Sequence, residues 1–177
     1  HSLLSAVPYL NEVVNSIHVN ELVIKMEKKE EKETSAFSSG LKGYIDMVFY
    51  DKDVPIAVLD IKYTGFNKRI SDLENSSDYQ LAIYNRLLGE DSLPKGYFLV
   101  RESKLLSNHR TFFGDKSMYV KNEESVSKQI AHFVDAVSKR KIEIVNGEIE
   151  IALGERLEEL KYWENLEFKY NNSWRKK

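Results

Sequence analysis

The most constraining feature of this chain is a pair of apolar segments, residues 43–50 and 56–63, on either side of the cluster Asp51-Lys52-Asp53. Both segments are rich in β-branched and aromatic residues, which favour strands, and the polar cluster favours a turn. The pattern therefore predicts an antiparallel hairpin. Apolar residues alternate poorly with polar ones along both strands, as is typical of strands that are buried on both faces.

Three charged residues, Asp46, Asp60 and Lys62, interrupt this apolar hairpin. A turn centred near residue 53 sets Asp46 opposite Asp60, and the i, i+2 spacing puts Lys62 on the same face as Asp60. Buried charges are costly unless they pair or bind a metal, and magnesium relieves the repulsion between two carboxylates. The sequence thus predicts a phosphodiester hydrolysis site, in which Lys62 orients a water molecule or stabilises developing charge. The alternative is a surface hairpin whose Asp and Lys residues only form ion pairs.

A second polar pair, Gln80 and Tyr84, follows on a predicted helix that begins at Asp78 and is stopped by Gly89. The i, i+4 spacing places both side chains on one face of that helix. We therefore expect them to form a polar stripe on an otherwise apolar element.

The remaining chain predicts further elements by hydrophobic periodicity. We expect helices at 3–17, with Pro8 inside, and at 125–139, and strands at 21–28, 96–101 and 118–120. Residues 28–39 form a polar run that predicts a loop, and residues 66–77 are polar without an assigned element. Asn146-Gly147, between Ile142-Glu143-Ile144 and Ile149-Glu150-Ile151, indicates a type I′ hairpin.

Three short motifs follow one another between residues 40 and 90: Gly43-x-x-Asp46, Asp60-x-Lys62 and Gln80-x-x-x-Tyr84. Each lies on a predicted strand or helix. In this order they resemble the RecB-like branch of the PD-(D/E)XK nucleases. The resemblance implies a restriction-endonuclease-like α/β fold and cleavage of DNA.

The resemblance also implies roles for individual residues. It makes Asp46 and Asp60 ligands of Mg²⁺ or Mn²⁺ and Lys62 a catalytic residue. Gln80 and Tyr84 would support the site and the DNA strand. The implied metal-binding set is Asp46, Asp60, Ile61 and His1. Many members of the family continue as Asp-Tyr-Lys-Thr-Gly, whereas this chain has one more residue, Tyr63, before Thr64-Gly65.

His1 enters that set because His1-Ser2-Leu3-Leu4 resembles the family's His-x-x-Leu context before the sheet. The alternative is that a terminal His is disordered and binds no metal. His18 is a poorer candidate, in the turn that follows the first helix. Glu27 could add a carboxylate, although a solvated strand charge is the commoner explanation, and His109 and His132 are expected at the surface.

Composition narrows the class of protein. The chain has no cysteine, which excludes disulfides, thiolate zinc sites and Cys-ligated iron–sulfur clusters and favours the cell interior. A formal net charge of -2 excludes nucleic-acid binding by bulk electrostatics, so any contact is local. No apolar run approaches the length needed to span a bilayer, so we expect a cytoplasmic, non-membrane protein.

Together these features predict a single domain over residues 1–177, or a fragment of a larger protein, with a mixed central sheet flanked by helices. The sheet is expected to include residues 22–28, 43–50, 56–63 and 96–101. The expected function is metal-dependent DNA cleavage, more exonucleolytic than endonucleolytic, in DNA repair or recombination, with a helicase domain or subunit delivering the strand. The alternatives are a structure-selective endonuclease and a catalytically silent nuclease-like module that binds DNA or protein.

Overall fold

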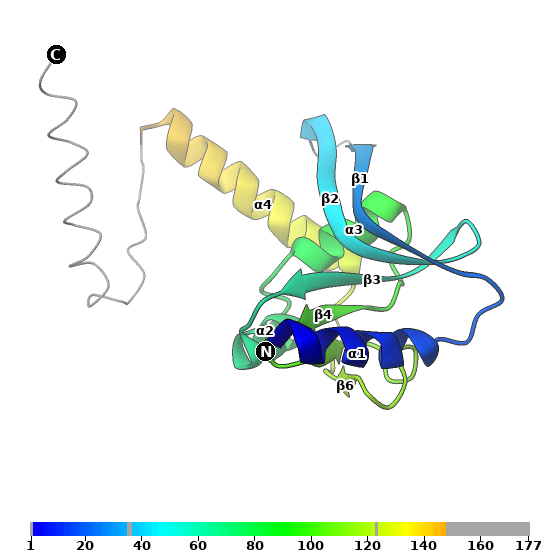
Figure 1. The fold of residues 1–177 in the computed structure, drawn as a ribbon. Helices are drawn as coiled ribbons and strands as arrows, with labels where there is room; N and C mark the ends of the chain where they lie inside the picture. Colours follow the sequence, from blue (N-terminus) through cyan, green and yellow to red (C-terminus); the bar gives the residue numbers. More distant parts are fainter. Residues whose placement is uncertain (1, 35–36, 123, 148–177) are drawn as a thin grey trace, which may run out of the picture. The chain divides into compact units, whose positions relative to one another are not determined.

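The structure is a computed structural model, and its description covers residues 2–34, 37–122 and 124–147. This part of the chain is α/β, with a mixed six-stranded sheet in the order β1-β2-β3-β4-β5-β6 (Figure 1). The elements are α1 (Ser2–Asn15), β1 (Leu22–Thr34), β2 (Phe37–Asp51), β3 (Val54–Lys62), α2 (Phe66–Asn75), α3 (Gln80–Leu88), β4 (Lys95–Leu99), β5 (Lys104–Ser107), β6 (Met118–Tyr119) and α4 (Val126–Val145).

The predicted hairpin is confirmed as the antiparallel pair β2 and β3. Asp51 pairs with Val54 across the turn, where Lys52 has a φ of 57°, and the pairing runs as far as Met47 opposite Leu59. Asp46 and Asp60 are therefore the next residues along the two strands. β3 then pairs in parallel with β4, and the two helices α2 and α3 make the connection between these strands.

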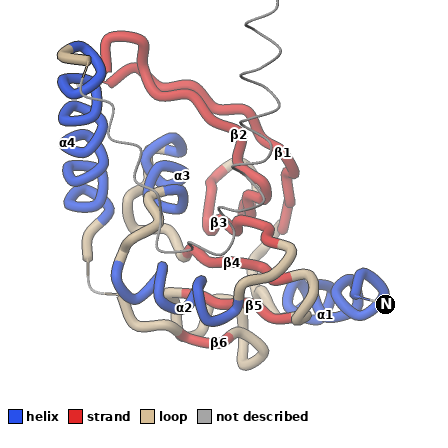
Figure 2. Tube along the Cα trace, turned by 90° about the vertical axis from the view of Figure 1, so that its left-hand side faces the viewer, coloured by secondary structure: helices blue, strands red, loops and turns tan. Residues whose placement is uncertain are grey.

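Two separate apolar clusters cover the two faces of the sheet. On one face, Leu73 of α2 and Leu81 of α3 pack with Val48 and Val58 of the hairpin. On the other face, Ala6 and Val13 of α1 belong to a cluster that also includes Met47, Phe49, Ala57 and Leu59. Figure 2 shows α1 and α3 on opposite sides of the strands. The hairpin is therefore buried on both faces, as its sequence predicts.

The β1–β2 pair bends where Glu27 aligns with Asp46. Met26 pairs with Met47 and Lys28 pairs with Ile45, but no pairing joins the two residues between them. Glu27 adopts a left-handed φ of 49°, which is unusual for a residue other than glycine. Ile45 and Val48 both belong to the cluster beneath α3. On a regular strand, residues three apart would lie on opposite faces of the sheet. Strand alternation is thus broken at Asp46, which lies at the bend.

The expected loop at residues 28–39 is wrong over its described part. β1 continues to Thr34 and β2 begins at Phe37, so the two strands extend past β3 as a two-stranded ribbon (Figure 1). Residues 28–33 of β1 read Lys-Lys-Glu-Glu-Lys-Glu, so neither face of the strand is apolar here. Even the side toward α3 carries a charge, since Lys32 donates to the Arg86 carbonyl oxygen. This composition removes the period-2 signal from which strands are predicted.

Two elements of the described chain were missing from the prediction. Residues 66–75 form α2, whose apolar signal is the spacing of Phe66, Ile70 and Leu73, all three packed in or against the cluster beneath α3. Residues 104–107 form β5, which is antiparallel to β4. The two strands approach so closely that a Cβ at Gly96 would lie 2.0 Å from the Leu106 carbonyl oxygen, so only glycine fits there.

The expected hairpin around Asn146-Gly147 is wrong in its first strand. Residues 142–144 belong to α4, which continues to Val145, and Gly147 then has a left-handed φ of 76°. The second expected strand, 149–151, lies outside the described residues. Asn-Gly suits a helix C-terminus as well as a type I′ turn, because both need a left-handed backbone. The boundary between the two units of the chain falls within α4, between Val137 and Ser138.

None of the described helices is long and apolar enough to cross a bilayer.

Candidate active site

Asp60 is the most deeply buried charged residue of the predicted site. It lies near the end of β3 with a side-chain exposure of 0%, and its Oδ2 is 2.7 Å from the Lys62 ammonium, whose side chain is 24% exposed. The two side chains share a face because they are two residues apart on one strand. Burial of Asp60 is thus compensated by one partly solvated cation.

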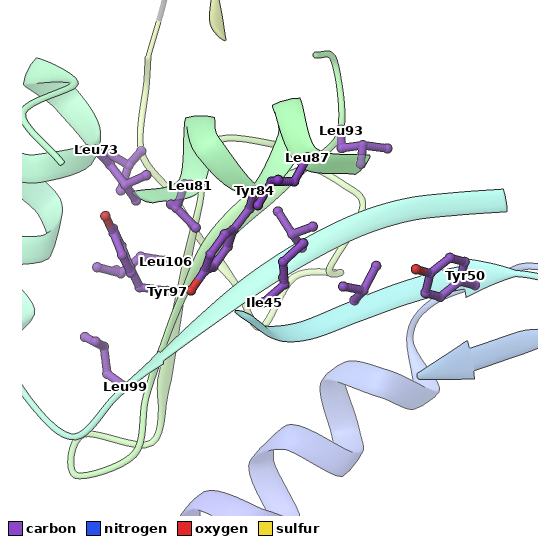
Figure 3. Packing of buried hydrophobic residues seen from close by; sticks show 13 residues of the cluster. Ile45, Tyr50, Leu73, Leu81, Tyr84, Leu87, Leu93, Tyr97, Leu99 and Leu106 are labelled. Carbon is purple, nitrogen blue, oxygen red and sulfur yellow. The ribbon is translucent and has the colours of Figure 1, made fainter. Parts of the chain in front are cut away.

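Two polar residues of α3 close a ring of contacts around this ion pair. Lys62 Nζ donates to Gln80 Oε1 at 2.9 Å, and Gln80 Nε2 donates to the Tyr84 hydroxyl at 2.6 Å. The Tyr84 hydroxyl in turn lies 3.4 Å from Asp60 Oδ1, a long hydrogen bond. In Figure 3 the Tyr84 side chain reaches from α3 toward the sheet between Ile45 and Tyr97. The i, i+4 stripe on α3 therefore faces the charged residues of β3.

Asp46 joins the group from the bend in β2. Its Oδ2 accepts a hydrogen bond of 2.9 Å from the backbone N–H of Ile61, one residue beyond Asp60. The side chain is half-buried, and its charge acts on both Asp60 and Tyr84. The structure thus brings together Asp46, Asp60, Lys62, Gln80 and Tyr84, from two strands and one helix.

The environment of the group makes the charged form of Asp60 less favourable than it is in water. Burial raises the pKa of Asp60 to about 6, the ammonium of Lys62 opposes this shift, and the charge of Asp46 adds to it. Burial also raises the pKa of Tyr84, as do the charges of Asp60 and Asp46, so its hydroxyl keeps its proton. Two neighbouring carboxylates with one raised pKa are a site at which an added cation would be stabilised.

The predicted accessory metal ligands contribute unequally. His1 lies outside the described residues. Ile61 has no side-chain ligand atom, so its backbone carbonyl oxygen is the one group it could offer. Glu27 is exposed at the bend aligned with Asp46, and His18, His109 and His132 are exposed as well. Over the described residues, no group of three or more His, Asp or Glu side chains could hold a metal.

The donor set nevertheless fits magnesium or manganese. Mg²⁺ commonly binds through one or two carboxylates and completes its shell with waters and substrate phosphate oxygens. Asp46 and Asp60 supply two carboxylates, and burial together with the charge of Asp46 keeps the pKa of Asp60 raised despite the Lys62 ammonium. A site with two carboxylates therefore meets the minimum that this cation requires.

Two charged residues next to the start of α3, Asp78 and Arg69, were not among the predicted site residues. The backbone N–H of Gln80 donates to Asp78 Oδ1 at 2.9 Å, and Asp78 Oδ2 lies 2.9 Å from Arg69 Nη1. Arg69 comes from α2, a helix that was not predicted from the sequence. Asp78 two residues before a helical Gln80 is a recognisable capping signal, whereas the pairing with Arg69 depends on tertiary structure.

The loop after Lys62 has its own anchor. Thr64 Oγ1 donates to Glu102 Oε1 at 2.6 Å, and Gly65 has a φ of 116°, which only glycine adopts readily. The Val100 N–H also donates to the Lys62 carbonyl oxygen at 2.9 Å. These contacts hold the chain on both sides of Tyr63, so the extra residue is accommodated in a fixed loop.

Comparison of the chain with protein-family models, with curated proteins and with solved structures found no match.

Proposed function

We propose that this protein is a metal-dependent DNA nuclease with a restriction-endonuclease-like fold of the PD-(D/E)XK type. The observation that carries the proposal is the contact between motifs that are separate in the sequence. Lys62 bonds to both Asp60 and Gln80, and Tyr84 lies next to Asp60. The α/β fold supports the same assignment, because the hairpin that carries Asp46, Asp60 and Lys62 is central in its mixed sheet.

Each residue of the site has its own role in the proposed phosphodiester hydrolysis. Asp46 and Asp60 would hold Mg²⁺ or Mn²⁺, which when bound polarises a phosphoryl oxygen and lowers the pKa of water. Lys62 carries the positive charge of the group, and its partly exposed ammonium can orient a water molecule or stabilise developing negative charge. Gln80 fixes the ammonium by its Oε1 atom, and Tyr84 fixes Gln80 from the other side.

DNA is the substrate that we propose, with exonucleolytic cleavage as the primary activity and structure-selective endonucleolytic cleavage as its alternative. The net charge of -2 supports a narrow contact near the site instead of a broad basic surface. A helicase domain or subunit that delivers the strand would supply the affinity that such a contact lacks.

The test is digestion of linear double-stranded, circular and single-stranded DNA with Mg²⁺, with Mn²⁺ and with EDTA. We expect cleavage that depends on the metal and is lost in Asp60→Asn and Asp46→Asn. Asp53→Asn, in the exposed turn of the same hairpin, is the matched control and should cleave normally. Loss of circular DNA would indicate endonuclease activity, and the absence of cleavage on all three substrates would instead favour a silent nuclease-like binding module.

A further inference from the structure

Gln80 is held at both ends by different groups. Its side chain contacts Lys62 and Tyr84, whereas its backbone N–H donates to Asp78 Oδ1 at 2.9 Å. Gln80 is the first residue of α3, and the first N–H groups of a helix have no partner within it. Asp78 therefore caps the helix at the very residue that bonds to the lysine of the site.

Asp78 is itself oriented by Arg69. The Arg69 Nη1 atom lies 2.9 Å from Asp78 Oδ2 and also 2.9 Å from Asp72 Oδ2, so one guanidinium bridges two carboxylates. Its central carbon lies 5.3 Å from the centre of the Tyr97 ring, and Tyr97 pairs with Asp60 across the β3–β4 ladder. Arg69 is thus fixed between α2, the start of α3 and the strand next to the site.

These contacts connect α2 to the first residue of α3. Asp72 is buried and also accepts hydrogen bonds from Lys68 and Ser77, so the end of the network in α2 is rigid. From there the contacts run through Arg69 and Asp78 to the backbone of Gln80. A shift of the first turn of α3 would move Gln80 Oε1 away from Lys62 Nζ, and a hydrogen bond weakens over a few tenths of an ångström.

We propose that Asp78 and Arg69 are positioning residues that set Gln80, and through it Lys62, for the reaction. The inference rests on the proposed function for its catalytic consequence, although the contact between Gln80 and Lys62 can be tested without activity. Neither Asp78 nor Arg69 is expected to touch the substrate.

The test compares Asp78→Ala, which removes the cap, with Asp78→Asn, whose amide oxygen can still accept the Gln80 N–H. The control is Asp91→Ala, which removes an exposed carboxylate that pairs with Arg86 beyond the other end of α3. The probe is the NMR signal of the Gln80 side-chain amide, with Lys62→Ala as the reference for a broken contact. Cleavage of linear DNA is measured in parallel as kcat and KM.

In Asp78→Ala we expect the Gln80 amide signal to move toward its position in Lys62→Ala and kcat to fall at least tenfold with little change in KM. Asp78→Asn should recover most of both, and Arg69→Ala should give an intermediate effect. An unmoved Gln80 signal in a folded Asp78→Ala protein would overturn the proposal. If the wild-type protein cleaves no DNA, the proposed function fails while the NMR comparison still decides the positioning role.

Discussion

The Lys62 ammonium lies 2.7 Å from Asp60 Oδ2, and this carboxylate has no exposed surface. A buried carboxylate depends on its partner far more than an exposed one does, because removal of the cation leaves an unpaired charge at low dielectric. Lys62 therefore has two roles that can be separated by experiment. It stabilises Asp60 in the folded protein, and in the proposed reaction it acts on water or on the transition state.

Lys62→Ala should abolish most cleavage and also lower stability. We expect cleavage to fall by at least ~100-fold, since a charge aimed at the reacting group is lost. The free energy of unfolding at pH 7 should decrease by about 1–3 kcal/mol, because Asp60 loses its cation while Lys62 is already partly solvated. Denaturant unfolding and single-turnover digestion measure the two effects.

The control for this substitution is Lys116→Ala, which removes a mostly exposed lysine that pairs with Glu12. Surface ion pairs contribute ~0–1 kcal/mol, so both stability and cleavage should remain close to wild type. Wild-type cleavage by Lys62→Ala would show that Lys62 is only a structural partner of Asp60.

The pKa of Asp60, raised to about 6 by burial, predicts how activity depends on pH and magnesium. A metal binds the carboxylate form, so protonation below about pH 6 competes with Mg²⁺ and cleavage should decline by about tenfold per pH unit. Because metal and proton compete, more Mg²⁺ should shift the midpoint to lower pH. A midpoint that does not move between low and high Mg²⁺ would exclude Asp60 as a ligand.

The hairpin could be predicted because its signals are local. Apolar runs and the Asp51-Lys52-Asp53 turn determine the pairing, and fixed spacings put Lys62 beside Asp60 and Tyr84 beside Gln80. The loop predicted at 28–39 failed for a physical reason as well. Residues 28–33 of β1 are all Lys or Glu, including Lys32 on the side that faces α3, so this part of the strand has no periodic apolar pattern in the sequence.

The bend at Asp46 and the layer behind Gln80 depend on tertiary structure. Asp46 accepts the Ile61 N–H at the bend, where Glu27 on the neighbouring strand takes a left-handed backbone that no local rule predicts for Glu. Arg69 and Asp78 are nine residues apart and meet because α2 and α3 pack on one face of the sheet. Such contacts depend on the fold, so the spacing of residues in the sequence does not predict them.

Tyr84→Phe separates the hydroxyl of Tyr84 from its packing. The ring is 4% exposed in the cluster beneath α3, so Tyr84→Ala would leave a cavity that costs about 3–5 kcal/mol and obscure any effect on cleavage. Phenylalanine keeps the ring and removes the bonds to Gln80 and Asp60. Cleavage should fall about tenfold, as for one hydrogen bond lost near the reacting centre, with less than ~1.5 kcal/mol lost in stability.

The matched control for this substitution is Tyr50→Phe. Tyr50 is buried in the same cluster, and its hydroxyl accepts a hydrogen bond from Lys28 instead of from a site residue. It should lose a similar amount of stability and keep its cleavage rate. Equal losses of cleavage in both variants would indicate that Tyr84 acts through the core alone.

Lys95 supplies a prediction outside the site. It is 3% exposed at the start of β4, and burial lowers its pKa from 10.5 to about 8 against the opposing charges of Asp91 and Glu124. A lysine with a lowered pKa destabilises the folded state wherever the unfolded chain holds the proton more tightly. The penalty is therefore complete below about pH 8 and disappears as the pH rises toward 10.5.

Lys95→Met should remove this penalty, because methionine is of similar length and carries no charge. At about 1.4 kcal/mol per pKa unit, the difference between 10.5 and about 8 corresponds to roughly 3 kcal/mol. The variant should therefore be the more stable protein at pH 7, and its advantage should shrink steadily between pH 8 and 10.5.

Denaturant unfolding of both proteins across this range measures the difference in stability, and the titration of the other groups, which both proteins share, cancels. Lys29→Met, at an exposed position of β1, should show no such trend. An advantage of Lys95→Met that stays constant with pH would mean that Lys95 titrates normally and that its ammonium is solvated.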